Sequence, residues 1–327
     1  MSRALITGIS GQDGSYLAEL LLERGYDVAG IVRGSPSGRF ENLDPIRDDV
    51  ELMQGDLLDQ LTLVEAITRF RPTELYNLAA TSFVPASWSQ PVMTAQFTAV
   101  GVTSMLEAAR VVDASIRIYQ ASSSEIFGAV TDSPQNEHTQ WRPHNPYGVS
   151  KLYGHAMVAA YRDRYGIHAS SGIVYNHESP RRPPDFVTRK ITRAAAAIKL
   201  GLTDELVLGD LDARRDWGFA GDVVEAMWLM LQQDRPDDYV IATGVSRSVR
   251  ELAHTAFSYL GLNFEDHVRV DPDLVRPREP VDLVGDPSKA HELLGWAPRT
   301  SFEELVRMMV DADLEQLSPP LAADRSA

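Results

Sequence analysis

The sequence predicts an α/β fold in which a doubly wound parallel sheet is accompanied by a smaller, mostly C-terminal lobe. Short apolar runs typical of buried strands alternate with helix-patterned segments from the N-terminus to about residue 245, as expected for strands joined by crossover helices. A glycine-rich turn, Gly8-Ile9-Ser10-Gly11-Gln12-Asp13-Gly14, joins the first apolar run to the first helical segment. Strand, glycine-rich turn and helix in this order open a dinucleotide-binding sheet, so the predicted fold is of the Rossmann type.

The expected elements follow this alternation along the chain. Strands of the main sheet are expected at residues 4–7, 27–32, 50–54, 74–78, 116–121 and 168–175, and a strand at 239–242 is expected to return to it. Helices are expected at residues 15–24, 63–70, 92–112, 147–164, 186–200, 223–232 and 302–314. A further short strand is expected at residues 205–208. Gly25 follows the first helix and Pro146 opens the helix at 147–164, each a residue type favoured at that position.

A chain of 327 residues with 44% hydrophobic content is expected to form two lobes. Residues 1–175 plus about 210–245 are predicted to make the dinucleotide-binding domain. Residues about 176–209 plus 246–317 are predicted to make the substrate-binding lobe. The segment 318–327 holds two prolines and small polar residues, so a flexible tail is expected there.

Composition excludes several classes of function. The chain has no cysteine, so it has no disulfide framework and no thiolate nucleophile. With no clustered histidines either, we predict no metal site. The net charge of −15 argues against nucleic acid and anionic membranes as partners. No apolar run approaches the length of about 18 residues needed to span a membrane, and no signal peptide precedes the first strand, so we expect a cytoplasmic protein.

One segment reverses the acidic character of the chain. Arg181, Arg182, Arg189, Lys190 and Arg193 fall within thirteen residues, and Arg214 and Arg215 follow soon after. Such a cluster is either a solvated basic face or a site for an anionic ligand, and the sequence alone leaves both interpretations open.

The glycine-rich turn is the predicted cofactor site. Its glycines allow close backbone approach, and the following helix N-terminus receives a pyrophosphate. The second strand ends at Arg33, where an acidic residue would bind the ribose of NAD and an arginine accommodates the 2′-phosphate of NADP. We therefore predict NADP, with NAD as the alternative. The predicted contacts are Gly8, Ser10, Gly11, Gln12, Asp13, Gly14, Arg33, Asp56, Leu57, Leu78, Ala79 and Ala80.

Tyr147 and Lys151 stand four residues apart in a predicted helix, so their side chains share one face. A phenol titrates near a pKa of about 10, too high for a base at neutral pH. A nearby ammonium favours the phenolate, so the pair is suited to moving a proton. A chance pairing is the alternative, and the neighbouring motifs decide between the two.

Those motifs resemble the extended short-chain dehydrogenase/reductase family. The resemblance rests on the glycine-rich turn, a serine after the fifth strand and the Tyr147/Lys151 pair. Longer runs look like those of the GDP-mannose 4,6-dehydratases within that family, over about residues 3 to 316. The runs are Thr7 through Leu22, Gln120 through Glu125, Asn176 through Arg182, Phe186 through Lys190, Asp212 through Gly218 and Glu225 through Leu231.

The resemblance implies a mechanism with four catalytic residues. Tyr147 takes the proton of the sugar 4-hydroxyl, and Lys151 keeps the pKa of Tyr147 low and contacts the nicotinamide ribose. Ser123 donates to the O4 oxygen. Glu125 removes the C5 proton as the 6-hydroxyl leaves as water, although an exposed carboxylate at a strand end is the alternative interpretation. The implied substrate is GDP-mannose, the product its 4-keto-6-deoxy derivative, and the cofactor NADP is recycled.

The resemblance also implies further binding residues. His177, a structural hydrogen-bonding residue rather than a catalyst, and Arg182 complete the cofactor set together with Tyr147 and Lys151. The expected substrate contacts are Ser82, Ser123, Glu125, Tyr147, Asn176, Lys190, Arg215, Arg276 and Glu279. Guanidinium groups suit phosphate oxygens because they bind them in a bidentate manner. Salt bridges to the 46 acidic residues of the chain are the alternative role for any one of these arginines.

The family resemblance implies a homodimer or a dimer of dimers. The predicted helices 92–112 and 147–164 are similar to the pair that forms a four-helix interface in this family. Tyr153, Met157, Val158 and Tyr161 are expected to supply its apolar stripe, and packing within the chain's own core is the alternative for them.

The chain departs from the family pattern at several positions. Gly34 stands where a second arginine is usual, in a loop that is shorter, and Thr81 replaces a glutamine. His144-Asn145 replaces Arg-Ser before Pro146, and Pro280-Val281 replaces Val-Asp. Related nucleotide-sugar enzymes of the same fold, a 4-epimerase or a decarboxylase, are therefore kept as alternative functions.

Overall fold

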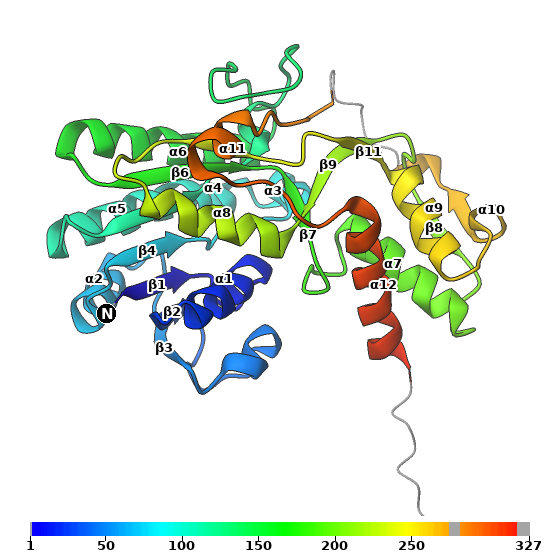
Figure 1. The fold of residues 1–327 in the computed structure, drawn as a ribbon, viewed down its shortest axis with the longest axis horizontal. Coiled ribbons are helices and arrows are strands. Elements are labelled where there is room, and N and C mark those ends of the chain that lie inside the picture. Colours follow the sequence, from blue (N-terminus) through cyan, green and yellow to red (C-terminus); the bar gives the residue numbers. More distant parts are fainter. Residues whose placement is uncertain (1, 275–281, 319–327) are drawn as a thin grey trace, which may run out of the picture. The chain divides into compact units, whose positions relative to one another are not determined.

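The computed structural model describes residues 2–274 and 282–318 (Figure 1). Two residues expected in the substrate site, Arg276 and Glu279, lie outside the described residues, as does the predicted tail from residue 319 onward.

A seven-stranded parallel sheet forms the centre of the first of two compact units. Its order is β10-β6-β5-β4-β1-β2-β3, and in register Leu5 pairs with Ala29 on one side and Leu75 on the other. The strands are β1 (Arg3–Thr7), β2 (Asp27–Val32), β3 (Val50–Gln54), β4 (Glu74–Asn77), β5 (Arg117–Ala121), β6 (Ala169–Val174) and β10 (Tyr239–Ile241). This topology confirms the predicted doubly wound fold, and all seven expected strands of the sheet are present.

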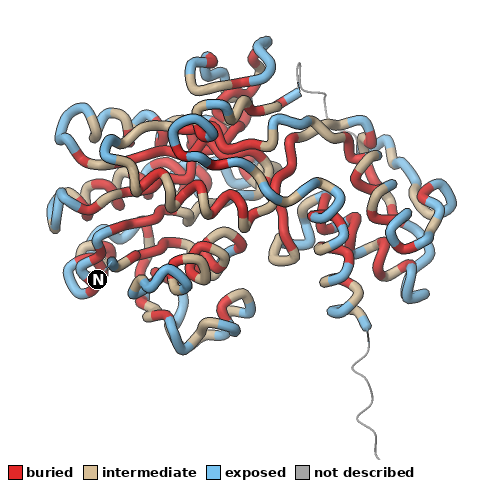
Figure 2. Tube along the Cα trace, viewed as in Figure 1, coloured by how far each residue is buried: buried red, intermediate tan, exposed pale blue. Residues whose placement is uncertain are grey.

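Helices cover both faces of this sheet. The helices of the first unit are α1 (Gln12–Glu23), α2 (Gln60–Phe70), α3 (Val84–Ser89), α4 (Pro91–Ala95), α5 (Gly101–Val112), α6 (Pro146–Tyr165), α8 (Ala220–Gln232) and α11 (Ser288–Leu294). One apolar cluster joins the sheet to α1 and α8, and a second joins it to α2, α5 and α6. Because both faces are covered, the inner strands are mostly buried, as the six buried residues of β6 and Figure 2 show.

Short helical segments complete the first unit. They are η1 (Glu41–Ile46), the π-helical η2 (Gln96–Val100) and η3 (Ser124–Ile126). The single helix expected at 92–112 is thus a run of α4, η2 and α5, because five residues of π-helix interrupt it.

The second unit packs three longer helices together. They are α7 (Val187–Lys199), α9 (Val249–Tyr259) and α12 (Phe302–Leu317), with α10 (Phe264–His267), η4 (Pro272–Leu274) and the paired strands β8 (Leu206–Leu208) and β12 (Val268–Val270). Buried Arg189 of α7 forms an ion pair of 2.7 Å with Asp313 of α12, which also accepts a hydrogen bond of 2.7 Å from Thr192. A buried ion pair with its remaining oxygen satisfied in this way ties α7 to α12.

The units divide the chain at different points from those that the sequence predicts. The first unit holds the described residues within Met1–His177, Asp216–Ser246 and Glu279–Arg299, and the second holds those within Glu178–Arg215, Arg247–Arg278 and Thr300–Ala327. Residues 282–299, expected in the second lobe, therefore belong to the first unit. A small sheet of order β11-β9-β7 consists of three short strands, β7 (Asn176–Glu178), β9 (Arg214–Phe219) and β11 (Ser246–Ser248). A boundary between the two units falls within each of these strands.

Three of the four residues expected in an interface stripe contact the chain's own core. Val158 is fully buried, and Met157 and Tyr161 pack against the same apolar cluster under α2 and α5. Only Tyr153 of that stripe is exposed. Val158 thus belongs to the chain's own core, whereas a role of the other three residues in an interface stays a prediction.

The helices α9 and α11 were not predicted from the sequence. The helix α9 begins with a capping box between Ser248 and Glu251, a pattern that marks helix starts. By contrast α11 is only seven residues long, too short for a clear helical period.

Among the described residues, no helix combines the length and apolarity needed to cross a membrane.

Candidate active site

The carboxyl ends of the parallel strands bring the predicted site residues of the first unit to one edge of the sheet. Gly8 follows β1, Arg33 follows β2, Asp56 lies just beyond β3, Leu78 follows β4 and Ser123 lies just beyond β5. Ligands of open α/β sheets bind outside this edge, where the strand order reverses, here between β1 and β4.

The glycine-rich loop has the geometry of an anion cradle. Gly8 adopts a φ of +73°, and a Cβ there would lie 3.0 Å from the backbone nitrogen of Ala79. At Gly14 a Cβ would overlap the carbonyl oxygen of Gly8. Only glycine fits both positions. Without side chains at these positions, an anion can approach the backbone N–H groups at the start of α1. The residues present therefore fit a dinucleotide pyrophosphate.

His177 fastens this loop to the segment after β6. Its Nε2 lies 2.8 Å from Asp13 Oδ2 and its Nδ1 lies 2.7 Å from the carbonyl oxygen of Tyr175. Its own carbonyl accepts a hydrogen bond of 3.1 Å from the Gln12 amide. Both ring nitrogens therefore have oxygen partners, one in the glycine-rich loop and one in the segment after β6. The side chain thus holds the loop, as expected of a structural residue.

A chain of buried polar side chains crosses the sheet beneath this edge. The Thr7 hydroxyl donates to Asn77 at 2.6 Å, and the Asn77 amide donates to Gln120 at 2.7 Å. The Gln120 amide in turn donates to the carbonyl oxygen of Ala121 at 2.9 Å. These residues were not predicted as site residues, because the sequence alone does not show that polar side chains of three different strands meet. They fix the ends of β1, β4 and β5 relative to one another.

The Tyr147/Lys151 pair lies in the first two turns of α6. Both side chains are buried, and the Lys151 ammonium is 5.7 Å from the centre of the Tyr147 ring. It donates a hydrogen bond of 2.8 Å to the carbonyl oxygen of Ala121. Burial lowers the pKa of Lys151 to about 8, while the carboxylate of Asp13 opposes that shift. The ammonium is therefore held beside the phenol and close to its own titration range.

Ser123 and Glu125 lie at the end of β5, next to the start of α6. The Ser123 oxygen accepts a hydrogen bond of 3.2 Å from the backbone nitrogen of Glu125. The Glu125 Oε2 atom accepts one of 2.8 Å from the side-chain amide of Asn145, the residue that caps α6. The structure thus brings all four predicted catalytic residues together. Asn145 was not among them, although an Asn before Pro146 is a recognisable helix cap.

The opposite end of the predicted cofactor site contains Arg33. Its guanidinium lies 5.0 Å from the centre of the Phe97 ring, which the π-helical segment η2 supplies. Buried Leu57 lies under Gly101, where a Cβ would be 3.0 Å from that of Leu57. Asp56 accepts a hydrogen bond of 2.9 Å from the backbone nitrogen of Leu58. Of the remaining predicted contacts, Ala80 is half-buried and Ser82 is exposed.

The second unit contains three of the predicted anion-binding residues. Arg182 Nε lies 3.1 Å from Glu178 Oε2 as an ion pair, and its guanidinium stacks 3.6 Å from the centre of the Phe186 ring. Lys190 donates a hydrogen bond of 2.8 Å to the carbonyl oxygen of Val207. Arg215 donates one of 2.7 Å to the carbonyl oxygen of Arg214. Asn176, in β7, is half-buried in the first unit.

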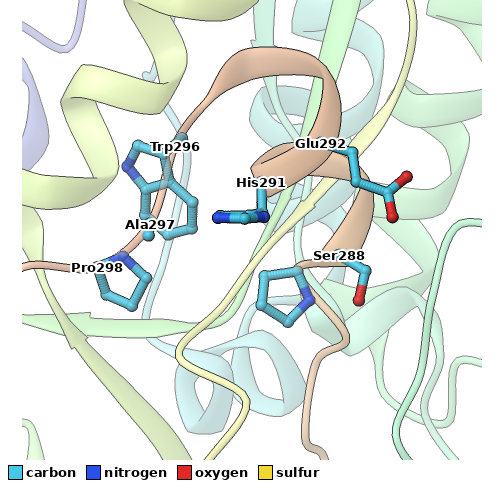
Figure 3. Close-up of a pocket in the computed structure, with 7 residues that line it drawn as sticks. Ser288, His291, Glu292, Trp296, Ala297 and Pro298 are labelled. Atoms are coloured by element: carbon cyan, nitrogen blue, oxygen red, sulfur yellow. The ribbon is translucent and has the colours of Figure 1, made fainter.

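A cavity of about 280 Å³ lies elsewhere in the first unit, along α11 and the segment after it (Figure 3). The His291 imidazole extends toward Trp296 there, and the indole nitrogen of Trp296 donates to the carbonyl oxygen of Asp222 at 2.8 Å. None of the predicted site residues lines this cavity. Within the described residues no cluster of three or more His, Asp or Glu side chains is arranged to hold a metal ion, and the absence of a metal stays a prediction.

Comparison with known sequences identifies close relatives. The sequence model of a family described as GDP-mannose 4,6 dehydratase matches residues 5–309. The chain is 50% identical to GDP-mannose 4,6 dehydratase 1 of Arabidopsis thaliana, over 95% of this chain and 90% of that protein. It is 48% identical to GDP-mannose 4,6 dehydratase of Homo sapiens, over 95% and 91% of the two chains. It is 45% identical to that of Yersinia enterocolitica, over 97% and 95%.

Solved structures share the fold. The UDP-glucose 4-epimerase of Thermotoga maritima with UDP-glucose matches at a TM-score of 0.87 and 25% identity, over 97% of this chain and 100% of that one. The UDP-glucose 4-epimerase of Thermus thermophilus in complex with NAD matches at a TM-score of 0.83 and 29% identity, over 95% and 98%. Both likenesses agree with the doubly wound sheet of the first unit.

The titration of Lys151 predicts an alkaline limit to proton transfer through Tyr147. The Lys151 side chain stabilises the Tyr147 phenolate only while Lys151 is protonated. The value of kcat/KM should therefore fall as pH rises through about 8, the pKa of Lys151 in the free enzyme. The pH dependence of kcat/KM reports groups of the free enzyme. In Lys151→Arg, whose guanidinium keeps its charge, the alkaline limb should move to higher pH. A limb at the same pH in that variant would assign it to another group.

Proposed function

Because the chain belongs to the GDP-mannose 4,6-dehydratase family, we propose that it is a hydro-lyase that converts GDP-mannose into GDP-4-keto-6-deoxymannose and water. The observation that carries this proposal is the position of Glu125. It lies two residues beyond Ser123, beside the helix that bears Tyr147 and Lys151, and its carboxylate is held by Asn145. Oxidation of a hydroxyl needs only the Ser–Tyr–Lys set, whereas elimination of water needs a further base.

The four residues have separate tasks in this proposal. Tyr147, as phenolate, takes the proton of the sugar 4-hydroxyl, and Lys151 stabilises that phenolate by its charge. Ser123 donates a hydrogen bond to the 4-oxygen. Glu125 then removes the C5 proton, which the 4-keto group makes acidic, while the 6-hydroxyl leaves as water. The proton held by Glu125 or Tyr147 is available to the departing oxygen, so the elimination balances.

A bound nicotinamide cofactor would supply the hydride chemistry, taking hydride from C4 and giving it back at C6. The second of the two protons held by Glu125 and Tyr147 would then return to C5, which completes the balance. The glycines at 8, 11 and 14, Ser10, Gln12 and Asp13 would hold its pyrophosphate at the start of α1. Asp56, Leu57, Leu78, Ala79 and Ala80 would line its adenosine half. The solved relative from Thermus thermophilus contains NAD. For this chain we propose NADP, because Arg33 follows β2 and no acidic residue stands there.

The second unit would supply groups for the nucleotide diphosphate. Its guanidinium and ammonium groups are suited to phosphate oxygens, and we assign this task to Lys190 and Arg215, together with Arg276, which lies outside the described residues. Arg182 is assigned to the cofactor, and because it pairs with Glu178, binding of a phosphate there would exchange one anion for another. Ser82, Asn176 and Glu279 are assigned to the sugar and ribose hydroxyls. A cytoplasmic location stays a prediction of the sequence.

The base is tested by Glu125→Gln, which keeps size and hydrogen bonding but removes basicity. We expect reduced nicotinamide to form on addition of GDP-mannose, while release of water falls by about 10²–10⁴ in rate. Stopped-flow absorbance and mass analysis of the sugar separate the two steps. Tyr147→Phe, as the control, should fail earlier and form no reduced cofactor. Normal dehydration by Glu125→Gln would remove the residue from the mechanism and favour a 4-epimerase.

Cofactor preference is tested by Arg33→Ala. In this proposal the Arg33 guanidinium binds the 2′-phosphate, so this change should weaken binding of NADP and leave binding of NAD nearly unchanged. Arg39→Ala is the matched control, because Arg39 lies in the following loop, 3.7 Å from Asp44. Calorimetric titration of each protein with both cofactors measures the effect. Equal weakening of the two cofactors, or tighter binding of NAD by the parent protein, would contradict the assignment.

We also propose a homo-oligomer built from a dimer. Apolar side chains are exposed on neighbouring helical segments: Val92 of α4 is 70% exposed, Val100 of η2 is 50% exposed and Tyr153 of α6 is 43% exposed. The Tyr153 hydroxyl lies 3.1 Å from that of Thr103 in α5, so these segments adjoin. Exposed apolar patches of this kind mark protein contacts.

Light scattering at micromolar concentration tests this interface. The parent protein should have at least twice the chain mass of 36.2 kDa. The double variant Val100→Arg/Tyr153→Arg should shift toward the monomer, because two charges would be buried in the contact. Leu202→Arg, at a residue 61% exposed in the second unit, serves as control and should keep the parent mass. A monomeric parent protein would exclude the proposal.

A further inference from the structure

Asn145 uses both ends of its side chain at the predicted active site. Its Oδ1 atom accepts a hydrogen bond of 2.8 Å from the backbone nitrogen of Gly148, three residues on. Its Nδ2 atom donates one of 2.8 Å to Glu125 Oε2, twenty residues earlier. The residue is only 5% exposed. A buried carboxamide with two such partners has one orientation and cannot rotate without losing both.

The first contact is an ordinary helix cap. Asn145 has extended backbone angles, φ −137° and ψ 158°, and its oxygen satisfies one of the N–H groups at the start of α6. A backbone N–H can only donate, so the oxygen of the carboxamide must face Gly148. The amide hydrogens therefore face Glu125. Helix capping alone would be satisfied equally well by aspartate or serine, neither of which brings an NH₂ group to Glu125.

The backbone of Glu125 is also held by its neighbours. Its nitrogen donates to the Ser123 oxygen at 3.2 Å. A Cβ placed on Gly148 would lie 2.5 Å from the carbonyl oxygen of Glu125, so the first turn of α6 packs directly onto this residue. With the backbone held at both sides, the Asn145 amide fixes the remaining freedom, the rotation of the carboxylate.

We propose that Asn145 is a positioning residue for Glu125. By binding Oε2, its amide orients the carboxylate so that the second oxygen, Oε1, receives the C5 proton of the sugar. The cap of α6 thereby sets the oxidising pair Tyr147/Lys151 and the eliminating base in one arrangement. This inference rests on the proposed function of Glu125 as the base.

Asn145→Asp separates this role from capping. Aspartate has the same shape and caps a helix as well as asparagine does, but it offers Glu125 a second carboxylate in place of a donor. We expect formation of reduced nicotinamide within about threefold of the parent rate, and elimination slower by about 10- to 100-fold, as for a misplaced catalytic group. Asn145→Ser, which keeps the cap and adds no charge, should slow elimination by a smaller factor.

The deuterium isotope effect at C5 distinguishes positioning of Glu125 from a purely structural role of Asn145, because loss of a structural contact alone would leave this effect unchanged. When proton removal is slowed, turnover of GDP-mannose deuterated at C5 should show a larger primary effect in Asn145→Asp than in the parent protein. Thermal unfolding of each variant, followed without substrate, checks that the fold is retained. An increased isotope effect with an unchanged rate of hydride transfer supports the inference.

Other outcomes overturn it, and they distinguish it from the proposed function. If Asn145→Asp matches the parent in both steps while Glu125→Gln fails in elimination, Asn145 is a cap only and the base assignment stands. If Asn145→Asp slows both steps equally, the residue acts through the helix and not through Glu125. If Glu125→Gln eliminates water normally, the base assignment itself is wrong, and this inference is wrong with it.

Discussion

The hydrogen bond from the Lys151 ammonium to the carbonyl oxygen of Ala121 is the contact on which the arrangement of the site depends. A charged group without access to water must have partners, because an unpaired ammonium in a protein interior is strongly destabilising. Lys151 meets this need at the last residue of β5 with a hydrogen bond of 2.8 Å. The same oxygen accepts from Gln120 at 2.9 Å. The position of α6 against β5 is therefore set by a polar contact in addition to apolar packing.

Polar contacts connect the end of β5 both to the glycine-rich loop and to Glu125. The buried chain Thr7–Asn77–Gln120 connects the end of β5 to the strand that precedes the glycine-rich loop. On the other side, the cap of α6 contacts Glu125. Small residues make these approaches possible, since Gly14 and Gly148 each stand where a Cβ would meet backbone atoms. The glycine-rich loop, the Tyr147/Lys151 pair and Glu125 are thus held by one connected framework within the first unit.

Several buried or partly buried charged side chains of this acidic chain are paired with a partner close in space. Asp13 opposes the effect of burial on the pKa of Lys151 and also lies 2.8 Å from His177. In the second unit the buried guanidinium of Arg189 is paired with Asp313, and Arg182 is paired with Glu178. The basic cluster that stands out in the sequence is therefore partly neutralised in the structure. A nucleotide phosphate would have to compete with such partners, which favours bidentate guanidinium contacts over single ammonium ones.

The sequence alone determined the features that depend on local pattern. Apolar runs marked every strand of the main sheet, the glycine spacing marked the first crossover, and the four-residue spacing of Tyr147 and Lys151 placed them on one helix face. These features depend on periods of two and 3.6 residues, which neighbouring residues set. Only the tertiary structure decided contacts between distant positions: Asn145 with Glu125 across 20 residues, and His177 with Asp13 across 164. It likewise decided that Val158 is core, and that residues 282–299 join the first unit, because burial depends on which surfaces the folded chain brings together.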